Sequence, residues 1–380
     1  MQLLTVDIGT GTQDIYLFRS GMSPENGFKV TAPSPTMRLR TKIQEATSRG
    51  EDLLLSGVTM GGGPCHWAAE DHLRAGHKIY ATPEAARTFN DDLDWVKQRM
   101  GIEIVSEEEA HELIQVHRIE LRDFDYAAIA SAFDSFGVQL EPAAIAVAVF
   151  DHGTAPPNVS DRQFRFDFLE RNLRADSKLS AFAYLAADLP PSLTRMRAVA
   201  ASAGNLDCPL VVMDTAPAAV LGATLDPHLA SRDRLMACNL GNFHTLAFRL
   251  GPSGIEGVFE HHTGLVDLAR LDDLLTAFAN GTLRHQDVFE EHGHGALILH
   301  PEPLPLETGP FGVAVTGPRR SMMQRSRLRP YFAVPYGDMM LTGCFGLLAA
   351  SADLLPNLAE PIHQALAGAD SDIAPWDAQA

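Results

Sequence analysis

The feature that most constrains the fold is a β-hairpin with a glycine-containing turn, which the sequence predicts once in each half of the chain. In the first half, apolar residues 3–7 and 14–18 flank Gly9-Thr10-Gly11-Thr12. In the second half, residues 235–239 and 245–250 flank a similar turn. Two short apolar segments around a glycine turn are typical of antiparallel strands. The two halves of the chain therefore begin in the same way.

Other segments indicate alternating strands and helices. Residues 36–41 indicate a third strand after the first hairpin. An apolar strand at 53–60, a helix at about 65–75 and a strand at 77–82 predict a βαβ unit. A continuous apolar run at 144–150 predicts a central strand. This alternation is the pattern of an α/β protein.

Length and charge narrow the functional classes. A chain of 380 residues corresponds to about two domains. The net charge of −18 argues against a broad surface for nucleic acid or an anionic membrane, which would need clustered Lys and Arg. No apolar stretch reaches the length of a membrane span, and the first residues do not form a signal peptide. We therefore expect a cytoplasmic protein that binds neither nucleic acid nor membrane.

The first turn has the composition of a phosphate-binding loop. Where a strand turns sharply through Gly and Thr, several backbone N–H groups converge and can hold a phosphate. Glycine lets the backbone approach a ligand closely, and the hydroxyls of Thr10 and Thr12 add donors. Asp7, at the end of the first strand, is suited to hold the water shell of Mg²⁺. The alternative is an ordinary glycine-rich hairpin.

Five motifs in a fixed order make the sequence resemble the superfamily of actin, sugar kinases and Hsp70 chaperones. They are similar to its first phosphate motif, first connecting helix, second phosphate motif, adenosine motif and second connecting helix. In that order they are Val6-Asp7-Ile8-Gly9-Thr10, Asp214-Thr215-Ala216-Pro217-Ala218-Ala219-Val220-Leu221-Gly222, Cys238-Asn239-Leu240-Gly241-Asn242-Phe243-His244-Thr245, Val315-Thr316-Gly317-Pro318-Arg319 and residues 337–346. The chain looks most similar to a branch that carries the label of pyruvate formate-lyase activating enzymes.

The resemblance implies two RNase H-like lobes, which together are the actin-like ATPase fold, with a nucleotide cleft between them. We expect the first lobe at 1–155, with the βαβ region inserted into it. The second lobe is expected at 156–350 with a His-rich insertion at about 257–305, followed by a tail at 351–380.

The resemblance also implies ATP and Mg²⁺ as ligands and suggests the residues that hold them. Asp7 would organise Mg²⁺, and Asp151 or Asp214 would orient the nucleophile. Gly317 would lie beside the nucleoside. The two turns would cradle the phosphates from opposite lobes, through Gly9, Thr10, Gly11, Thr12, Gly241, Asn242, His244 and Thr245.

Departures from the superfamily pattern weaken the prediction of fast ATP hydrolysis. The second phosphate motif has Asn239 where the superfamily has Asp, and Asn242 and Phe243 interrupt its glycine run. In the adenosine motif, Pro318 replaces a second glycine, and proline has no N–H. These changes permit phosphate binding more readily than they permit fast turnover.

The cysteines do not fit the reaction in the label of that branch. A radical activase needs three cysteines at CxxxCxxC spacing to hold an iron–sulfur cluster. The four cysteines, at 65, 208, 238 and 344, form no such run. Cys65 lies in the first turn of a predicted helix, where the helix N-terminus lowers the pKa of a thiol. It is therefore either a reactive thiol or a packed core residue.

Histidines late in the chain are candidate metal ligands. Glu260-His261-His262 and His292-Gly293-His294 bring together side chains that suit a transition metal. We therefore take His261, His262 and His294 as possible ligands, with exposed histidines that bind nothing as the alternative. His244, inside the second turn, could instead contact a phosphate.

Three further segments each have two interpretations, one functional and one structural. Asp151-His152 follows the central strand and is either an acid–base or metal-binding pair or an Asx turn. Gly61-Gly62-Gly63-Pro64 either binds an anion or only joins a strand to a helix. The arginines within residues 319–329 either clamp an anionic substrate or form ion pairs in a solvated loop.

Three functions remain at this stage. The leading one is an ATP-dependent phosphotransferase or ATPase, in which positioning and charge neutralisation drive phosphoryl transfer. The second is a non-hydrolysing, nucleotide-gated activator that acts on a client protein. The third is a metal-dependent enzyme that has lost nucleotide use and works through the histidine segments. The acceptor, whether a small molecule, a protein or water, is left open.

Overall fold

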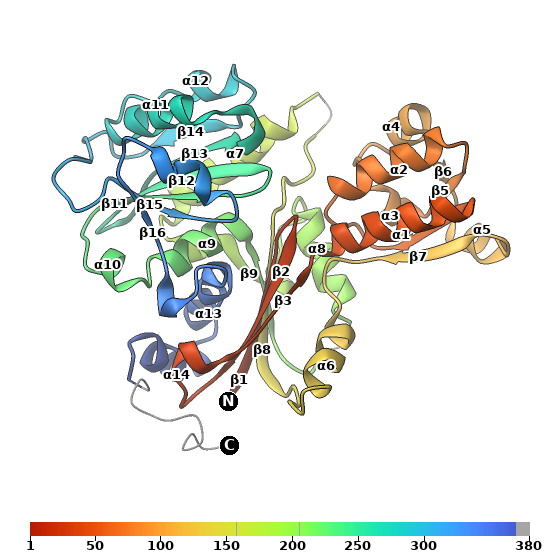
Figure 1. Ribbon diagram of the computed structural model, residues 1–380, viewed down its shortest axis with the longest axis horizontal. Coiled ribbons are helices and arrows are strands. Elements are labelled where there is room, and N and C mark those ends of the chain that lie inside the picture. Colours follow the sequence, from red (N-terminus) through yellow and green to blue (C-terminus); the bar gives the residue numbers. More distant parts are fainter. Residues whose placement is uncertain (157, 205, 370–380) are drawn as a thin grey trace.

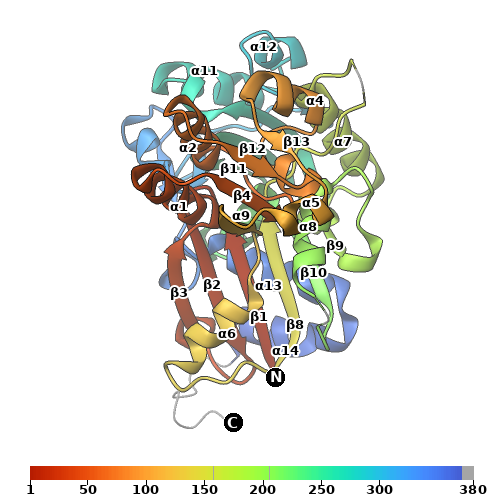
Figure 2. The same cartoon turned by 90° about the vertical axis from the view of Figure 1, so that its right-hand side faces the viewer.

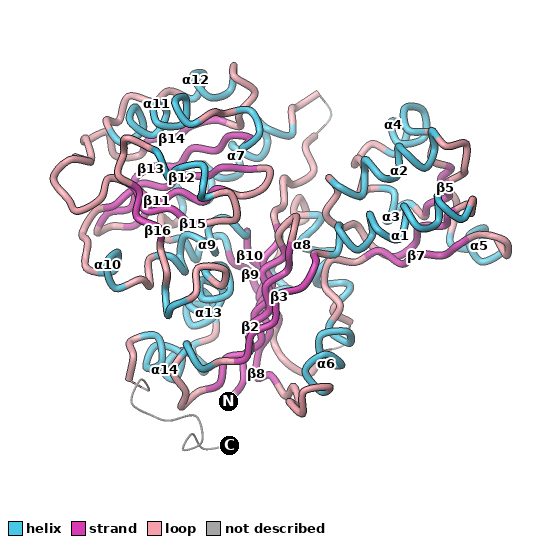
Figure 3. Tube along the Cα trace, in the orientation of Figure 1, coloured by secondary structure: helices cyan, strands magenta, loops and turns pink. Residues whose placement is uncertain are grey.

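Three β-sheets organise the computed structural model, which describes residues 1–156, 158–204 and 206–369 (Figure 1, Figure 3). The first sheet has the strand order β3-β2-β1-β8-β10-β9, and its main strands lie side by side in Figure 2. Its first three strands are antiparallel, whereas β8 runs parallel to β1 and β10 parallel to β8. The strands are β1 (Gln2–Ile8), β2 (Thr12–Arg19), β3 (Phe28–Pro33), β8 (Pro142–Val149), β9 (Ala183–Leu185) and β10 (Leu210–Asp214).

The second sheet repeats this arrangement. Its strand order is β14-β13-β12-β11-β15-β16. Strands β11 to β13 are antiparallel, whereas β15 runs parallel to β11 and β16 parallel to β15. The strands are β11 (Leu235–Leu240), β12 (His244–Gly251), β13 (Gly254–His262), β14 (Gly295–Ile298), β15 (Val313–Thr316) and β16 (Pro330–Phe332).

Five strands of each sheet are equivalent, and the edge strands β9 and β14 have no counterpart in the other sheet. In each, three antiparallel strands in chain order are followed by two strands parallel to the first, so β1, β2, β3, β8 and β10 correspond to β11, β12, β13, β15 and β16. This is the strand order of an RNase H-like lobe. The chain therefore has the two-lobed, actin-like fold, and both predicted hairpins are confirmed.

A third, smaller sheet is inserted between β3 and β8. It consists of parallel strands in the order β6-β5-β4-β7, and in Figure 1 it lies on the right of the first lobe. Its strands are β4 (Leu53–Gly57), β5 (Ile79–Ala81), β6 (Glu103–Ile104) and β7 (His117–Leu121). Helices α1 (Pro35–Arg49) and α2 (Pro64–Arg74) pack on it through apolar residues that include Leu39, Ile43 and Ala69.

The prediction of a strand at 36–41 is wrong, because this segment is the start of α1. The hydroxyl of Ser34 accepts a hydrogen bond from the backbone N–H of Met37, and Pro35 occupies the first helical position. Both features favour a helix start. The third strand of the sheet lies earlier, at β3, where half-buried and exposed residues alternate and no residue is fully buried.

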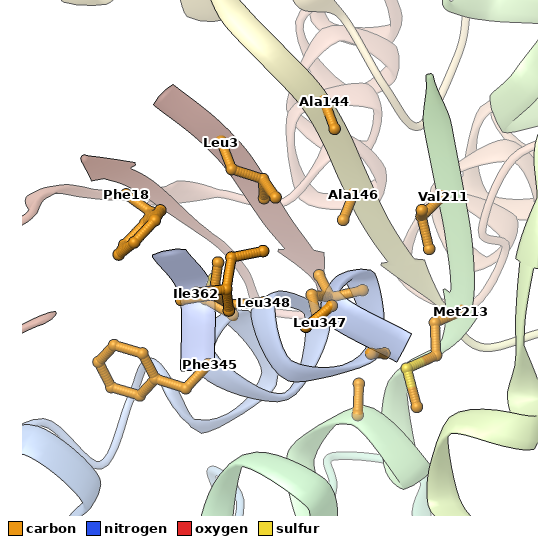
Figure 4. Close-up of a cluster of buried hydrophobic side chains, with 14 of the residues drawn as sticks. Leu3, Phe18, Ala144, Ala146, Val211, Met213, Phe345, Leu347, Leu348 and Ile362 are labelled. Atoms are coloured by element: carbon orange, nitrogen blue, oxygen red, sulfur yellow. The ribbon is translucent and has the colours of Figure 1, made fainter. Parts of the chain in front are cut away.

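The last two helices of the described chain complete the first lobe. Figure 4 shows the apolar cluster that joins α13 (Thr342–Leu354) and α14 (Pro356–Leu366) to the first sheet. Phe345, Leu348 and Ile362 are fully buried there. The expected tail at 351–380 is thus helical to residue 366, and residues 370–380 lie outside the described ranges.

Two glycines let the predicted connecting helices meet. These are α9 (Thr215–Ala223), which follows β10, and α13. A Cβ atom on Gly222 would lie 1.7 Å from the carbonyl oxygen of Thr342, and one on Gly346 would lie 1.8 Å from that of Ala218. Backbone contact between the two helices therefore requires glycine at both positions.

The lobes divide later in the chain than the expected boundary at 155. Strands β9 and β10 still belong to the first sheet, so the chain enters the second sheet only after α9. The segment 257–305 is an insertion only in part, because β13 is a central strand of the second sheet. The extra elements are α12 and β14.

The remaining helices cover the sheets. No helix within residues 1–369, the two gaps aside, combines the length and the apolarity needed to cross a bilayer. The helices not yet given are α3 (Pro83–Ala86), α4 (Leu93–Trp95), α5 (Glu107–Glu112), α6 (Tyr126–Asp134), α7 (Asp161–Ala175), α8 (Thr194–Ser202), α10 (Pro227–Ala230), α11 (Leu268–Ala279) and α12 (His285–Phe289).

Candidate functional site

A cavity of about 550 Å³ lies between the two lobes and the inserted sheet. Both predicted phosphate turns line it, and so do the glycine loop after β4 and the end of β15. Of the site residues expected from the sequence, it brings together Asp7, Gly9, Thr10, Gly11, Thr12, Asp151, Gly241, Asn242, His244, His262 and Gly317.

The two phosphate turns have the same construction. Gly9 N–H donates to the carbonyl of Thr12, and Gly241 N–H donates to the carbonyl of His244, both at 2.9 Å. The turns also approach each other, because a Cβ on Gly11 would lie 3.2 Å from Nδ2 of Asn242. Each lobe thus presents an equivalent loop to the same cavity.

The loop amides are available to a ligand. Within the described part of the chain, no hydrogen bond uses the backbone N–H of Thr10, Gly11, Asn242 or Phe243. Free amides that line a cavity are the groups that hold phosphate oxygens in other nucleotide-binding loops. Both loops therefore have the donors that a polyphosphate would need.

Asp7 is a half-buried carboxylate at the end of β1. Its Oδ1 accepts a hydrogen bond of 2.6 Å from the hydroxyl of Thr215, at the start of α9. Burial raises the pKa of Asp7 to about 7, against the opposing effect of Thr215, and Asp14 and Asp214 raise it further. A Cβ on Gly343 would lie 1.9 Å from the Asp7 Oδ2, so α13 needs glycine to pass this carboxylate.

Asp151 and Asp214 have structural partners. The carboxylate of Asp151 accepts hydrogen bonds from the backbone N–H of Gly153 at 2.8 Å and of Met196 at 2.9 Å. The bond from Gly153 forms the Asx turn that the sequence offered as one alternative for this segment. Asp214 caps α9 and forms a buried ion pair with Arg165. It does not line the cavity.

Arg165 links the two lobes through buried charges. Besides Asp214 in the first lobe, it contacts Glu260 of β13 at 3.3 Å, and it donates to the carbonyl of Asp151 at 3.1 Å. Its guanidinium also lies over the ring of Phe150. Burial opposes the charge of Arg165, but the two carboxylates outweigh it and raise its pKa.

Thr245 and Gly317 support the second loop from within the lobe. Thr245 is fully buried, 2.9 Å from the Thr263 hydroxyl, and does not reach the cavity. Gly317 has a φ of +97°, and a Cβ there would lie 2.4 Å from the carbonyl of Leu240. The backbone at Gly317 therefore lies directly against the end of β11, beside Pro318 at the cavity.

The histidines group differently from the sequence prediction. His294 lies with His152 and His244, and one ring nitrogen of each is within 4.8 Å of those of the other two. The ring of His262 is adjacent, 4.8 Å from that of His294. His261 instead points Nδ1 toward the carbonyl of His262, and it does not line the cavity.

Burial keeps the imidazoles of His152, His244 and His262 neutral at pH 7. Burial lowers the pKa of His152 to about 3 and that of His262 to about 4, and in both cases the neighbouring His294 lowers it further. Burial also lowers the pKa of His244 well below its usual value. Glu260, in contrast, is ionised. Burial opposes its negative charge, but His294 and Arg165 outweigh burial and hold the pKa of Glu260 well below its usual range.

Two arginines that line the cavity, Arg195 and Arg87, were not predicted from the sequence. Arg195 donates to both oxygens of Asp123, at 2.7 and 3.1 Å, and to the carbonyl of Phe150 at 2.7 Å. Asp123 also accepts the N–H of Gly61. Arg195 and Arg87 line the cavity, whereas no arginine within 319–329 does. Nothing local in the sequence distinguishes these two arginines.

Of the two interpretations of Cys65, the structure supports the packed core residue. Cys65 is fully buried at the start of α2, and burial raises the pKa of its thiol to about 11. The desolvation of the thiolate therefore outweighs any effect of the helix N-terminus.

A family model with the description "Putative pyruvate format-lyase activating enzyme (DUF1786)" matches residues 60–322, more than half of the chain. The chain belongs to this family. The matched part of the chain begins just after β4 and contains the second of the predicted phosphate loops and the histidine group. Asp7 and the first loop precede it.

Comparisons with other proteins add little to the family assignment. No curated protein matches the sequence. Among solved structures, the Aquifex aeolicus PPX-GPPA enzyme is 10% identical over 71% of this chain and 55% of that chain, with a TM-score of 0.20. The Aquifex aeolicus member of the Ppx/GppA family is 9% identical over 98% and 99%, with a TM-score of 0.25. Because these TM-scores are low, the fold assignment rests on the strand order of the two sheets.

Proposed function

We propose that this protein binds ATP–Mg²⁺ in the cavity between its lobes and acts as a phosphotransferase or ATPase. The observation that carries the proposal is the pair of equivalent turns, one from each lobe, with free amides beside a common cavity. A polyphosphate is the ligand that satisfies amides from two such loops at once.

The residues of the site fit this ligand. Asp7 has one oxygen bound to Thr215, and no residue in the described ranges donates a hydrogen bond to the other, so that oxygen can receive a water of Mg²⁺. Gly317 and Pro318 form the part of the cavity wall where a nucleoside would lie. Arg87 and Arg195 would offset the charge of the phosphates. Magnesium would neutralise the charge that develops during phosphoryl transfer.

A second function, a nucleotide-gated activator with negligible turnover, is favoured by one observation. Both carboxylates expected to orient a nucleophile are already engaged, Asp151 with two backbone N–H groups and Asp214 with Arg165. A base that accepts a proton must have a free oxygen within reach of the substrate. Slow hydrolysis would then serve to change the state of the lobes rather than to make product.

Calorimetric titration tests whether a nucleotide binds. The purified protein is titrated with ATP, ADP and a non-hydrolysable ATP analogue, with and without Mg²⁺. We expect binding that depends on Mg²⁺ and weakens at least about tenfold in Asp7→Asn, because the carboxylate that orders the ion is lost. Asp188→Asn is the matched control, since Asp188 is exposed and does not line the cavity.

Phosphate release separates the two functions. Turnover of ATP that Asp7→Asn abolishes supports the enzyme, whereas tight binding without release supports the activator. Absence of binding by every nucleotide in the folded wild-type protein would overturn both.

A further inference from the structure

Three histidines from separate segments converge on one point in the wall of the cleft. His152 follows β8, His244 begins β12, and His294 precedes β14. Their ring centroids are 5.1 to 5.7 Å apart, and their potential ligand nitrogens all lie within 4.8 Å of one another. This spacing needs only small side-chain movements for all three to reach one ion, since metal–nitrogen bonds are about 2.0–2.1 Å long.

His294 has a nitrogen without a partner. Its side chain is fully buried, and Nδ1 lies 2.5 Å from Oε1 of Glu260. In the neutral ring whose Nδ1–H donates to the carboxylate of Glu260, Nε2 carries the lone pair. Within the described residues, Nε2 is buried and has no hydrogen-bond partner. A buried acceptor left unsatisfied is unfavourable, and a metal ion would satisfy it.

We propose that His152, His244 and His294 together bind one divalent transition-metal ion, with zinc as the representative ion. Three imidazoles select ions of this class, whereas Mg²⁺ and Ca²⁺ prefer oxygen ligands. The centre goes beyond the proposed nucleotide function, and it stands whether or not a nucleotide binds.

Glu260 and Arg165 form the support of this centre. A metal-binding histidine commonly donates its other ring N–H to a carboxylate, which fixes the ring and strengthens the ligand. Glu260 plays that part for His294 and is itself held by Arg165 at 3.3 Å. The buried negative charge of Glu260 also offsets part of the charge of the ion.

The centre has an open side toward the cavity. His152 and His244 line the cavity, together with the adjacent His262. Three protein ligands and one exchangeable position are the arrangement of catalytic rather than structural zinc sites. The fourth ligand is therefore water or an anionic oxygen of a molecule in the cavity, and His244 places the ion next to the second phosphate loop.

Simple packing is a weaker explanation of the group. Some contacts are those of packed rings, since His244 stacks on Phe150 with centroids 4.2 Å apart and an interplanar angle of 7°. Packing alone, however, leaves Nε2 of His294 without a partner in the protein core. Buried polar atoms of this kind are rare and normally have a bound partner.

Metal titration of stripped protein tests the centre. The full-length protein is treated with a chelator, dialysed and titrated with Zn²⁺ by calorimetry, and Co²⁺ is added separately to record its visible absorption. We expect one ion per chain and intense Co²⁺ bands typical of a four-coordinate site. His152→Gln, His244→Gln and His294→Gln should each weaken Zn²⁺ binding by at least about 100-fold, and Glu260→Gln by about 10–100-fold.

The controls separate loss of the site from loss of the fold. His363→Gln removes an exposed histidine of α14 and should leave the affinity unchanged. Circular dichroism identifies any variant that does not fold, and the Co²⁺ spectrum of the wild type is informative without variants. The proposal is overturned if folded wild-type protein binds no stoichiometric ion, or if the three histidine variants bind Zn²⁺ as the control does. Nucleotide titrations do not enter either result.

Discussion

At the scale of single residues, the cavity contains groups whose properties are set by burial more than by sequence. Asp7 and Cys65 both occupy positions at which sequence motifs suggest a charged, reactive group. In the structure each is desolvated, and burial raises the pKa of each. The motif thus locates the residue, and the surroundings decide its protonation.

Asp7 gives a prediction about stability and pH. Its pKa in the folded protein is about 7, above the usual 3.8, so the ionised form is disfavoured by folding. The contribution of Asp7 to stability therefore falls as pH rises from about 4 to 7. In metal-free protein, Asp7→Asn should be more stable than wild type at pH 8 by a few kcal/mol and gain much less at pH 5. Urea unfolding at both values measures this, and an equal gain at both would contradict the assignment.

Cys65 gives a prediction about reactivity. With its pKa raised to about 11, the thiol should react with iodoacetamide at pH 8 far more slowly than a free cysteine, whose pKa is about 8.5. Cys208 is the partly exposed thiol and should react first. Mass spectrometry of the native protein, with Cys208→Ser as the control, measures both sites. Rapid labelling of Cys65 in the folded protein would restore the reactive interpretation.

At the scale of elements, the contact between α9 and α13 joins the parts that were predicted from separate motifs. The two helices follow strands that are equivalent in the two lobes. They meet through Gly222 and Gly346, where any side chain would collide with backbone atoms. Backbone atoms cannot move aside without shifting a helix.

Gly346→Ala should therefore destabilise the protein strongly. The added Cβ would lie 1.8 Å from the carbonyl oxygen of Ala218, and we expect a loss of about 3 kcal/mol or more, in the range of severe overpacking. Gly264→Ala is the matched control, because nothing lies within 4 Å of its Cβ position. Chemical unfolding of both variants measures the difference, and equal stabilities would show that the crossing can relax.

Local patterns predicted some elements and not others. Both hairpins follow from apolar segments around short glycine turns, which are local signals. Strand β13 was hidden, because its buried residues include Glu260 and His261. The partners of Glu260 are Arg165 and His294, which are 95 and 34 positions away along the chain. A polar residue that becomes buried through such distant partners looks like a loop in the sequence.

The candidate site was predictable to a similar extent. The motif order located Asp7 and both phosphate loops, because each is a contiguous segment with a functional composition. The histidine group comes from three segments; the sequence indicated His294 as a metal ligand and His152 as one of several alternatives, but it did not indicate that these two meet His244. Arg195 and Arg87 carry no local signal at all, since Arg195 comes from α8 and Arg87 from the inserted region just after α3, and only the fold brings both to the cavity.

At the scale of the whole molecule, a buried chain of charges crosses from one lobe to the other. Arg165 of α7 contacts Asp214 at the end of the first sheet and Glu260 in the second. The same glutamate holds His294 at the proposed metal centre. Movement of one lobe relative to the other would therefore alter both the cavity and the histidine group.

Arg165→Met should lower the free energy of unfolding more than the loss of any exposed ion pair does. It leaves Asp214 and Glu260 buried without their cation, which typically costs about 3–5 kcal/mol. Arg174→Met, on the same helix but in an exposed pair with Glu170, should cost less than about 1 kcal/mol. Guanidinium unfolding compares them. Equal losses for the two variants would mean that the buried contacts do not hold the lobes together.

The central claim is that a polyphosphate lies between two equivalent loops. A crystal structure of the protein with Mg²⁺ and a non-hydrolysable ATP analogue tests it most directly. We predict phosphate oxygens within hydrogen-bonding distance of the amides of Thr10, Gly11, Asn242 and Phe243, with Mg²⁺ beside Asp7 and the nucleoside near Gly317. An analogue bound elsewhere, or a cavity without it at saturating concentration, would contradict the account.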